Sequence, residues 1–401
     1  MTVKELIARS KAAQAEFAFA TQEQADAAAK AICKVVYDNA EKLGPMAAEE
    51  SRMGSEQDKI AKCRNKSALI WESLKGKKSC DIINRIEERR MIEVAKPVGV
   101  VASIIPSTNP VVTPMSNGAF ALKCRNSVIF APHPRAVKCT KLLVEMFRAE
   151  LKKLGLPEDL VLGLEEVSND LTSELMSAAD MVVATGGMGM VKAAYSSGKP
   201  AIGVGQGNVQ CIIDEDADIA DAVGKIIIGR AFDNGLICLG EQTVFVPEDK
   251  EAEFVAEMKK QGGYLVEGEE NVDKLREGLF PGGGAFSRVV VGMFADQVSD
   301  EIGLGAPKGT RVLFAKAKAL GAGDVLCREK LCPVIAYMTY KTFKEGVAMM
   351  EANLDHEGKG HSIAVHSNTP ENVEYAAIRC CVSRVVVNQP SGTTGGGSPT
   401  N

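Results

Sequence analysis

The strongest constraint on the fold is a regular alternation of short apolar runs with amphipathic stretches, which begins at Val98 and continues almost to the end of the chain. The apolar runs, such as residues 98–105 and 201–204, have the length of strands and carry no regular polar alternation. Strands of this kind are buried on both faces, so the pattern predicts parallel sheets covered by helices on both sides. We therefore expect an α/β protein whose ligands bind at the carboxyl ends of its strands.

Residues 4–75 precede this alternation and show helical spacing of apolar positions. Residues 82–97 change to a rough alternation of charged and apolar residues, which indicates a hairpin-like excursion with one wet face; an ordinary surface strand is the alternative. Further helices are expected at residues 115–123, 136–154, 171–178, 190–197, 218–232, 250–261, 343–352 and 371–380. Further strands are expected at residues 126–131, 160–162, 181–184, 243–246, 287–291, 311–314, 334–339, 361–366 and 384–388.

The composition is that of an ordinary globular enzyme and argues against several other functions. Of the 401 residues, 25% are charged and 5% are aromatic, and the net charge of −5 provides no basic surface for nucleic acid. No apolar run reaches the roughly 18 residues that a membrane-spanning helix needs, and the charged N-terminus is unlike a signal peptide. The 11 cysteines and four histidines lack metal-ligand spacing. We therefore expect reduced thiols in a reducing compartment and no structural metal.

Cys238 is the candidate nucleophile, because it lies where a helix turns into a strand. The amphipathic run 218–232 ends at Asn234 and Gly235, two residues that tolerate the left-handed backbone conformation of a helix stop. Cys238 follows three residues later, shortly before the apolar run 243–246. A thiol at such a turn can be accessible while its backbone stays rigid, which suits a nucleophile. On this pattern alone, a buried structural cysteine is the alternative.

Other candidate segments also lie beside expected strands. Asn109 follows the run 98–105, where its amide can reach the carboxyl edge of a sheet, although a turn residue before proline is the alternative. The glycine-rich residues 185–190 stand between a strand and a helix, where a backbone can approach a pyrophosphate; a plain turn fits equally well. On pattern alone, residues 132–135 and Glu329 are typical of exposed loops.

Five strings in this chain form a recognisable series, namely IPSTNP at residues 105–110, APHPRA at 131–136, VKAAYSSGKPAIGVG at 191–205, FDNGLICLGEQ at 232–242 and EKLCP at 329–333. In content and order they resemble motifs of the CoA-acylating aldehyde dehydrogenases, including the aldehyde domain of bifunctional aldehyde-alcohol dehydrogenases. The resemblance covers most of the chain, from about residue 90 to residue 390.

The resemblance implies an aldehyde dehydrogenase-like fold, with two doubly wound α/β domains and a small interface hairpin. The expected domains are a discontinuous cofactor-binding domain at 1–81 and 98–209, the interface hairpin at 82–97, a catalytic domain at 210–380, and a return strand with a glycine-rich tail at 381–401. Family members continue beyond the position of Asn401 with a final association strand. If the chain ends there, we expect a homo-oligomer weaker than the family's dimers and tetramers.

The resemblance also assigns roles to individual residues. Cys238 is the nucleophile that carries the acyl group as a thioester, and Asn109 donates a hydrogen bond to the oxyanion. Glu329 holds the nicotinamide ribose of NAD, with NADP as the alternative cofactor, and coenzyme A is the acyl acceptor. The remaining residues expected to bind the cofactor are Pro132, His133, Pro134, Arg135, Thr185, Gly186, Gly187 and Gly205.

Departures from related families bear on the reaction. Val204 stands where hydrolytic aldehyde dehydrogenases carry the glutamate that activates water, which favours CoA as the acceptor. His133 replaces a lysine of those enzymes and Ala136 a ribose-binding glutamate, while Gln206 and Cys332 replace a usually smaller residue and a serine. A hydrolytic enzyme and an inactive scaffold protein are the alternatives. The aldehyde is not indicated, and the expected location is the cytoplasm, with a bacterial microcompartment as the alternative.

Overall fold

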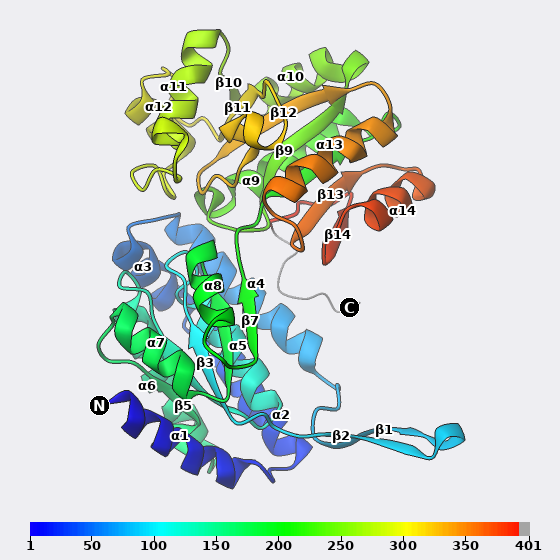
Figure 1. The fold of residues 1–401 in the computed structure, drawn as a ribbon. Coiled ribbons are helices and arrows are strands. Elements are labelled where there is room, and N and C mark those ends of the chain that lie inside the picture. The colour runs from blue at the N-terminus through cyan, green and yellow to red at the C-terminus, as the bar shows by residue number, and fades with distance from the viewer. Residues whose placement is uncertain (393–401) are drawn as a thin grey trace. The chain divides into compact units, whose positions relative to one another are not determined.

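The computed structural model describes residues 1–392, which form two compact units (Figure 1). Unit 1 comprises Met1–Arg52 and Glu56–Gly205. Unit 2 comprises Met53–Ser55 and residues 206–392. Each unit has its own parallel sheet and its own hydrophobic cores, as the alternation of apolar and amphipathic runs predicts. Most of the expected glycine-rich tail lies outside the described residues.

Unit 1 contains a five-stranded parallel sheet. Its strands are β3 (Val100–Ile104), β4 (Ser127–Ala131), β5 (Val161–Gly163), β6 (Met181–Thr185) and β7 (Ala201–Val204). They lie in the order β5-β4-β3-β6-β7, because the chain builds outward from β3 and then returns to place β6 on the other side of β3. The strand order therefore reverses between β3 and β6, and ligands of doubly wound sheets bind at such a point.

Helices cover both faces of this sheet, because successive strand residues point to opposite sides. Val101 and Phe130 belong to one core, whereas their neighbours Val100 and Ile129 belong to a core on the other face. The first face is covered by α2 (Gln22–Asp38), α5 (Val112–Lys123) and α6 (Val137–Lys153), and the second by α1 (Val3–Phe17), α7 (Asn169–Ala178) and α8 (Met188–Tyr195). A helical pair, α3 (Ala40–Ser51) and α4 (Glu56–Leu74), packs against α2.

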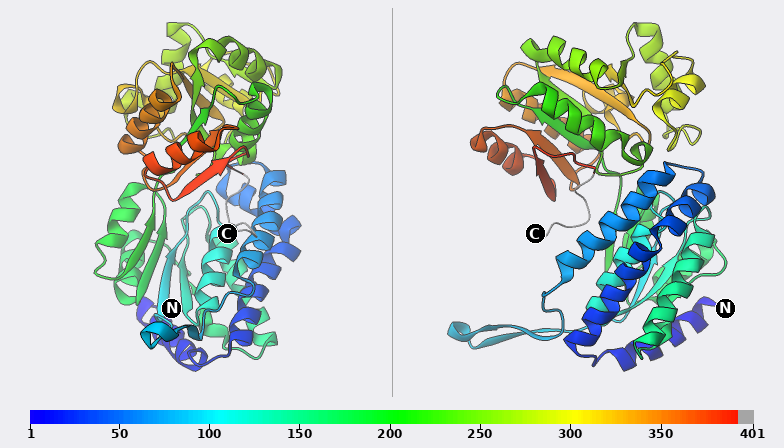
Figure 2. Two further views of the ribbon diagram at one scale, coloured as in Figure 1. Left: turned by 90° about the vertical axis from the view of Figure 1, so that its right-hand side faces the viewer. Right: turned by 180° about the vertical axis from the view of Figure 1, so that it is seen from behind.

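The segment expected to form a hairpin contains the antiparallel strands β1 (Asp81–Ile86) and β2 (Met91–Ala95). The hairpin extends away from the helices of unit 1 in Figure 1 and in the right-hand view of Figure 2. It carries several exposed apolar side chains, those of Ile82, Ile83, Met91, Ile92 and Val94. Clustered exposed apolar residues mark interaction surfaces. The use of this hairpin as an interface stays a prediction.

Unit 2 contains a seven-stranded parallel sheet. Its strands are β8 (Val209–Ile213), β9 (Glu241–Pro247), β10 (Gly263–Leu265), β11 (Val312–Lys316), β12 (Val334–Tyr340), β13 (Ser362–His366) and β14 (Arg384–Val387). They lie in the order β10-β11-β12-β9-β8-β13-β14. The chain starts at β8, fills one side of the sheet with β9 to β12, and returns to add β13 and β14 on the other side.

Helices also cover both faces of this second sheet. Phe254 packs against Phe314 and Tyr337, with ring centroids 6.3 and 5.5 Å apart, which anchors one helical layer to the strands. That layer consists of α9 (Ile219–Ala231) and α10 (Glu251–Lys260), and the opposite one of α13 (Phe343–His356) and α14 (Pro370–Arg379). A third core contains α11 (Glu269–Leu279) and α12 (Ala295–Ile302).

The structure differs from the sequence-based expectations in part of unit 2. Residues 288–290 form bends and residue 291 belongs to a turn, so the strand expected at 287–291 is wrong. Val290 is buried but Val289 is 56% exposed, and the backbone N–H of Gly292 donates to a loop carbonyl, that of Leu331, at 2.8 Å. The run is therefore a packed loop. Four elements were not expected from the sequence, namely β8, β10, α11 and α12.

Candidate active site

In unit 1, the residues predicted to bind the cofactor follow neighbouring strands. Residues 132–135 follow β4, Asn109 follows β3, Thr185 ends β6, and Gly205 follows β7. These four strands lie side by side and run parallel, so the segments meet at the carboxyl edge of one sheet. The segments thus share an edge on which ligands of such sheets bind, and their binding role stays a prediction.

The loop after β4 and the turn after β6 present mainly backbone and exposed side chains. Pro132 is buried, whereas the three residues that follow it are exposed. The backbone N–H of Arg135 donates to Nδ1 of His133 at 3.1 Å, which folds the loop back on itself. The backbone N–H of Gly186 donates to the carbonyl oxygen of Val204 at 3.1 Å and ties the β6 turn to the end of β7.

The helices that follow β4 and β6 differ at their N-termini. The N-terminus of α6 is occupied, because Glu50 accepts hydrogen bonds from the backbone N–H groups of Lys138 and Cys139 at 2.6 and 2.8 Å. Gly187, the N-cap of α8, makes no side-chain bond, and a Cβ placed there would meet nothing within 4 Å. The N–H groups of a first helical turn attract phosphate. Of these two helices, α8 is the one whose N-terminus fits a pyrophosphate.

Asn109 is half-buried in the loop between β3 and α5. Its backbone oxygen accepts a hydrogen bond of 3.2 Å from Thr113 in the first turn of α5, which fixes the loop to that helix. Its side-chain oxygen accepts a hydrogen bond of 3.0 Å from Nζ of Lys62, and its Nδ2 lies 3.4 Å from Oγ1 of Thr108. The donor end of the Asn109 amide therefore lies opposite to Lys62.

In unit 2, Cys238 is half-buried in a tight turn between α9 and β9. Three consecutive residues after α9, Asp233, Asn234 and Gly235, have φ angles of 49°, 53° and 72°. The predicted helix stop at Asn234 and Gly235 is confirmed, and Asp233 extends it. A backbone hydrogen bond of 3.0 Å from Gly240 closes the turn that contains Cys238.

The left-handed turn before Cys238 is anchored by other residues of unit 2. Oδ1 of Asp233 accepts a hydrogen bond of 3.0 Å from the backbone N–H of Ser55. Nδ2 of Asn234 donates to the carbonyl oxygen of Gly292 at 2.9 Å, and the N–H of Gly54 donates to the same oxygen at 3.0 Å. Positive φ angles are unfavourable for residues other than glycine. These hydrogen bonds offset that cost and hold the turn in place.

The structure brings Cys238 and Glu329 together at the amino edge of the second sheet. Cys238 precedes β9, Glu329 precedes β12, Gly207 precedes β8 and His361 precedes β13, and these four strands are neighbours. The N–H of Gly207 donates to Oε1 of Glu329 at 2.9 Å. A Cβ on Gly207 would collide with the carbonyl oxygen of Cys238 and lie 2.9 Å from Nε2 of His361. The candidates of unit 2 therefore lie at the edge opposite to the expected one.

A buried polar network supports the loop that carries Glu329. The guanidinium of Arg230 is fully buried and donates to the carbonyl oxygens of Lys330 and Cys332. The side-chain oxygen of Gln242 accepts from the backbone N–H of Lys330 at 2.9 Å, and its nitrogen donates to the carbonyl oxygen of Lys330 at 3.3 Å. The position of Glu329 is thus fixed by hydrogen bonds to the backbone on its carboxyl side.

Burial shifts the acid–base properties of this network. The pKa of Glu329 is raised to about 7, mainly by burial and against the hydrogen bond from Gly207. Burial also lowers the pKa of Lys330 to about 7 and raises the pKa of Glu241 to about 7. The ammonium of Lys330 donates to two backbone carbonyl oxygens, at 2.6 and 2.8 Å. Perturbed values of this kind gather at functional sites, although structural networks also produce them.

His361 is a member of the cluster that was not among the sequence-based candidates. Burial is the main cause that lowers its pKa, with the charge of Arg384 as the second cause, so the imidazole is neutral near pH 7 and able to accept a proton. The sequence does contain a signal for His361, because it directly precedes the apolar strand β13. Glu329 and Cys238 likewise lie a few residues before β12 and β9. Residues placed before parallel strands share one edge of the sheet.

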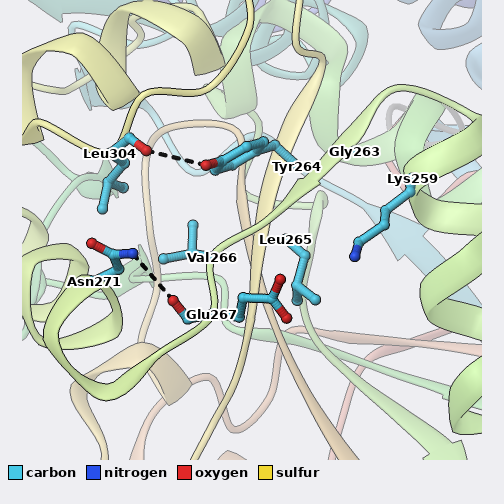
Figure 3. Close-up of a pocket in the computed structure, with 8 residues that line it drawn as sticks. All are labelled: Lys259, Gly263, Tyr264, Leu265, Val266, Glu267, Asn271 and Leu304. Atoms are coloured by element: carbon cyan, nitrogen blue, oxygen red, sulfur yellow. Dashed lines mark hydrogen bonds between the residues drawn. The ribbon is translucent and has the colours of Figure 1, made fainter.

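No group of three or more histidine, cysteine or carboxylate side chains within residues 1–392 is arranged to hold a metal ion. No helix among the same residues is long and apolar enough to span a membrane. A cavity of about 450 Å³ lies beside edge strand β10 in unit 2 (Figure 3). Its lining, which includes Tyr264, Glu267 and Asn271, contains none of the predicted site residues.

Comparisons with known proteins agree with the fold and the motifs. The aldehyde dehydrogenase family matches residues 1–274. The chain is 47% identical to the succinate-semialdehyde dehydrogenase (acetylating) of Clostridium kluyveri, over 99% of this chain and 87% of that protein. An acetylating aldehyde dehydrogenase from Geobacillus thermoglucosidasius has a TM-score of 0.93 at 35% identity, over 98% of this chain and 88% of the other.

A more distant solved structure is also similar. It is a propionaldehyde dehydrogenase from Rhodopseudomonas palustris with bound CoA and an acylated cysteine. Its TM-score is 0.87 at 27% identity, over 99% of this chain and 90% of the other. The predicted α/β fold and the predicted resemblance are both confirmed. The chain therefore belongs to the aldehyde dehydrogenase family, within its acylating group.

Proposed function

We propose that this protein oxidises a short-chain aldehyde with NAD and transfers the acyl group to coenzyme A through a thioester on Cys238. The observation that carries the proposal is the cluster at the amino edge of unit 2. There Gly207 lies against the backbone of Cys238 and beside His361, and its N–H donates a hydrogen bond to the carboxylate of Glu329. A thiol, a carboxylate that can accept hydrogen bonds from a ribose, and a neutral imidazole are the groups that the reaction requires.

Each unit, taken by itself, has residues suited to one part of a dinucleotide. In unit 1 the open N-terminus of α8 at Gly187 suits the pyrophosphate, with Thr185, Gly186 and Gly205 beside it on the same sheet edge. In unit 2 the buried carboxylate of Glu329 suits the nicotinamide ribose. When bound, NAD supplies the acceptor for the hydride, and NADP is the alternative. Residues 132–135 are proposed to line the adenosine half of the cofactor or the passage for CoA.

The chain's own residues carry the remaining chemistry. The thiolate of Cys238 bonds to the carbonyl carbon of the aldehyde, and the carbonyl oxygen becomes an oxyanion. Asn109 donates from Nδ2 to that oxyanion, together with the backbone N–H of Cys238. After hydride loss the acyl group is a thioester on Cys238. The CoA thiol then attacks it, His361 takes the thiol proton, and Cys238 leaves as a thiolate.

The acceptor is CoA and not water because Val204, at the end of β7, has no atom that accepts a proton. Without CoA we expect one burst of NADH, about one per active site, followed by a stall. With CoA, turnover continues and acyl-CoA accumulates in step with NADH. NADH absorbance, with product analysis and a panel of aldehydes, measures both. Sustained NADH formation without CoA, with a carboxylic acid as product, would establish the hydrolytic alternative, and no NADH with any aldehyde would favour an inactive scaffold.

We further propose that the protein is a homo-oligomer in which the β1–β2 hairpin contacts another copy. The exposed apolar side chains of the hairpin support this, because residues such as Ile92 and Val94 are about half exposed. Ile92→Glu should therefore lower the mass found by light scattering.

We also propose a cytoplasmic location, which is supported by eleven cysteines that all lie within residues 1–392 and form no disulfide there.

A further inference from the structure

We infer that Lys62 is a positioning residue that orients the amide of Asn109 toward the oxyanion and strengthens it as a donor. The inference rests on the proposed function of Asn109 as an oxyanion donor. Both residues belong to unit 1, Lys62 on α4 and Asn109 in the loop after β3. Nζ of Lys62 donates a hydrogen bond of 3.0 Å to Oδ1 of Asn109.

This hydrogen bond determines which end of the amide is presented. The ammonium group of lysine has three donors and no acceptor, so its partner on Asn109 must be the oxygen. Nδ2 then lies on the opposite side of the amide, where its contact to Oγ1 of Thr108 is 3.4 Å, long enough for an oxyanion to compete with it. Without Lys62 the amide can rotate by half a turn and present its oxygen, which repels a negative charge.

The contact is built into the fold rather than made by a mobile surface side chain. Lys62 is 4% exposed, and on the same face of α4 lie the buried residues Lys59, Cys63 and Lys66. Lysine is rarely buried without a partner, because its ammonium loses hydration. The cavity beside the pair has a volume of about 10 Å³, room for about one water molecule. Lys62 therefore has little freedom to swing away from Asn109.

The charge of Lys62 also affects the strength of the donor. A cation bound to the amide oxygen draws electron density from the amide nitrogen, and hydrogen bonds in a chain strengthen each other by roughly 10–30%. The benefit grows as negative charge develops on the substrate oxygen, because only then does the Asn109 donor face an anion. The effect therefore belongs to the transition state and lowers kcat more than it changes substrate binding.

The test begins with two substitutions at Lys62 in the full-length protein. Lys62→Met keeps the length of the side chain and removes its donors, and we expect kcat to fall roughly 10- to 100-fold, the usual range for one hydrogen bond to a charged group. The KM values for aldehyde and CoA should change by no more than about twofold, whereas Lys62→Arg, which retains a cationic donor, should recover part of the lost rate. Lys66→Met is the matched control for loss of a buried lysine on α4, and its kcat should stay within about twofold of the parent.

A double-mutant cycle with Asn109→Ala decides how Lys62 acts. If Lys62 works through Asn109, then Lys62→Met has almost no further effect on kcat once Asn109 is alanine. An equal loss in both backgrounds would overturn the inference while the role of Asn109 stands. If Asn109→Ala leaves kcat unchanged, the proposed role of Asn109 fails and the inference fails with it. Thermal melts of all variants show which of them remain folded. If Lys62→Met is unfolded, Lys62→Arg is used in its place in the cycle.

Discussion

The candidate sites of the two units are built in opposite ways. In unit 1 the segments lie at the carboxyl edge of the sheet, and the proposed phosphate site is a helix N-terminus that Gly187 leaves open. In unit 2 the residues lie at the amino edge, and Gly207 is crowded by Cys238 and His361 and bonded to Glu329. One edge thus offers backbone and open space, and the other offers buried side chains in close contact.

The difference teaches that strand direction alone does not locate a site. A helix N-terminus points its N–H groups at the carboxyl edge, and this suits a ligand that is bound mainly by backbone. At the amino edge of unit 2, Arg230 and Gln242 hold the loop that carries Glu329. Hydrogen bonds of Asp233 and Asn234 hold the turn before Cys238, and a fixed position is what a nucleophile needs. Within one chain, the proposed cofactor-binding segments thus rely on backbone N–H groups, whereas the proposed reactive residues rely on buried hydrogen bonds that fix their positions.

The largest effect is expected from removal of the proposed nucleophile, Cys238. Cys238→Ser should abolish acyl transfer and leave NAD binding nearly intact, because a serine hydroxyl is a far weaker nucleophile. Steady-state assays and NAD titration measure the two. Cys381→Ser, at an exposed cysteine, is the control and should retain activity. Iodoacetamide should label Cys238 first among the cysteines, and faster labelling elsewhere with an active serine variant would contradict the assignment.

The same small change at the two glycines tests the contrast between the edges directly. Gly207→Ala should lower kcat/KM by roughly 10²-fold, because displacement of reacting groups by about 1 Å has that effect. Gly187→Ala should leave the Tm nearly unchanged and lower kcat/KM far less, since the added methyl meets no protein atom within 4 Å. Rate assays with both variants, paired with melting curves, make the comparison. Similar losses at both positions would show that the carboxyl edge of unit 1 is as tightly packed as the amino edge of unit 2.

A charge at the N-terminus of α8 tests the proposed pyrophosphate site. Gly187→Asp places a carboxylate where the phosphates are expected, and we predict a rise in the KM for NAD of roughly tenfold or more, as for like charges brought together. Gly187→Asn is the matched control, because it is similar in shape and also caps helices well. Both variants should keep the parent Tm or exceed it. An unchanged KM in the aspartate variant argues that the phosphates bind elsewhere.

The smallest effects concern the pH dependence of stability in unit 2. Glu241 has its pKa raised from 4.5 to about 7, so the folded protein holds this proton more tightly, and the free energy of unfolding falls as pH rises between those values. Lys330 has its pKa lowered from 10.5 to about 7, so the free energy of unfolding rises with pH across that window. Glu241→Gln and Lys330→Met should each remove one slope in denaturant titrations, whereas the exposed controls Glu371→Gln and Lys308→Met should remove neither.

The sequence predicted the layers better than it predicted the contacts. Apolar runs and helical spacing located most elements, because burial on two faces leaves a continuous apolar pattern. Residues 287–291 were wrongly predicted to form a strand, because an apolar run does not reveal whether another strand lies beside it to form a sheet. His361 was missed since its proposed role depends on the strand order that places it at the same sheet edge as Cys238. The pairing of Lys62 with Asn109 joins residues 47 positions apart, and lysines on a helix are read as solvated.

Residues 53–55 have a consequence for how the chain reaches its final form. This short segment belongs to unit 2, although unit 1 lies on both sides of it in the sequence. During synthesis it emerges long before Asp233 and Gly292, the residues whose oxygens accept hydrogen bonds from Ser55 and Gly54. A fragment that starts at residue 206 therefore lacks two of the hydrogen bonds that hold Gly292 and the turn before Cys238. The early segment therefore has to wait for the later one, and this part of unit 2 is completed only after residue 292 has been made.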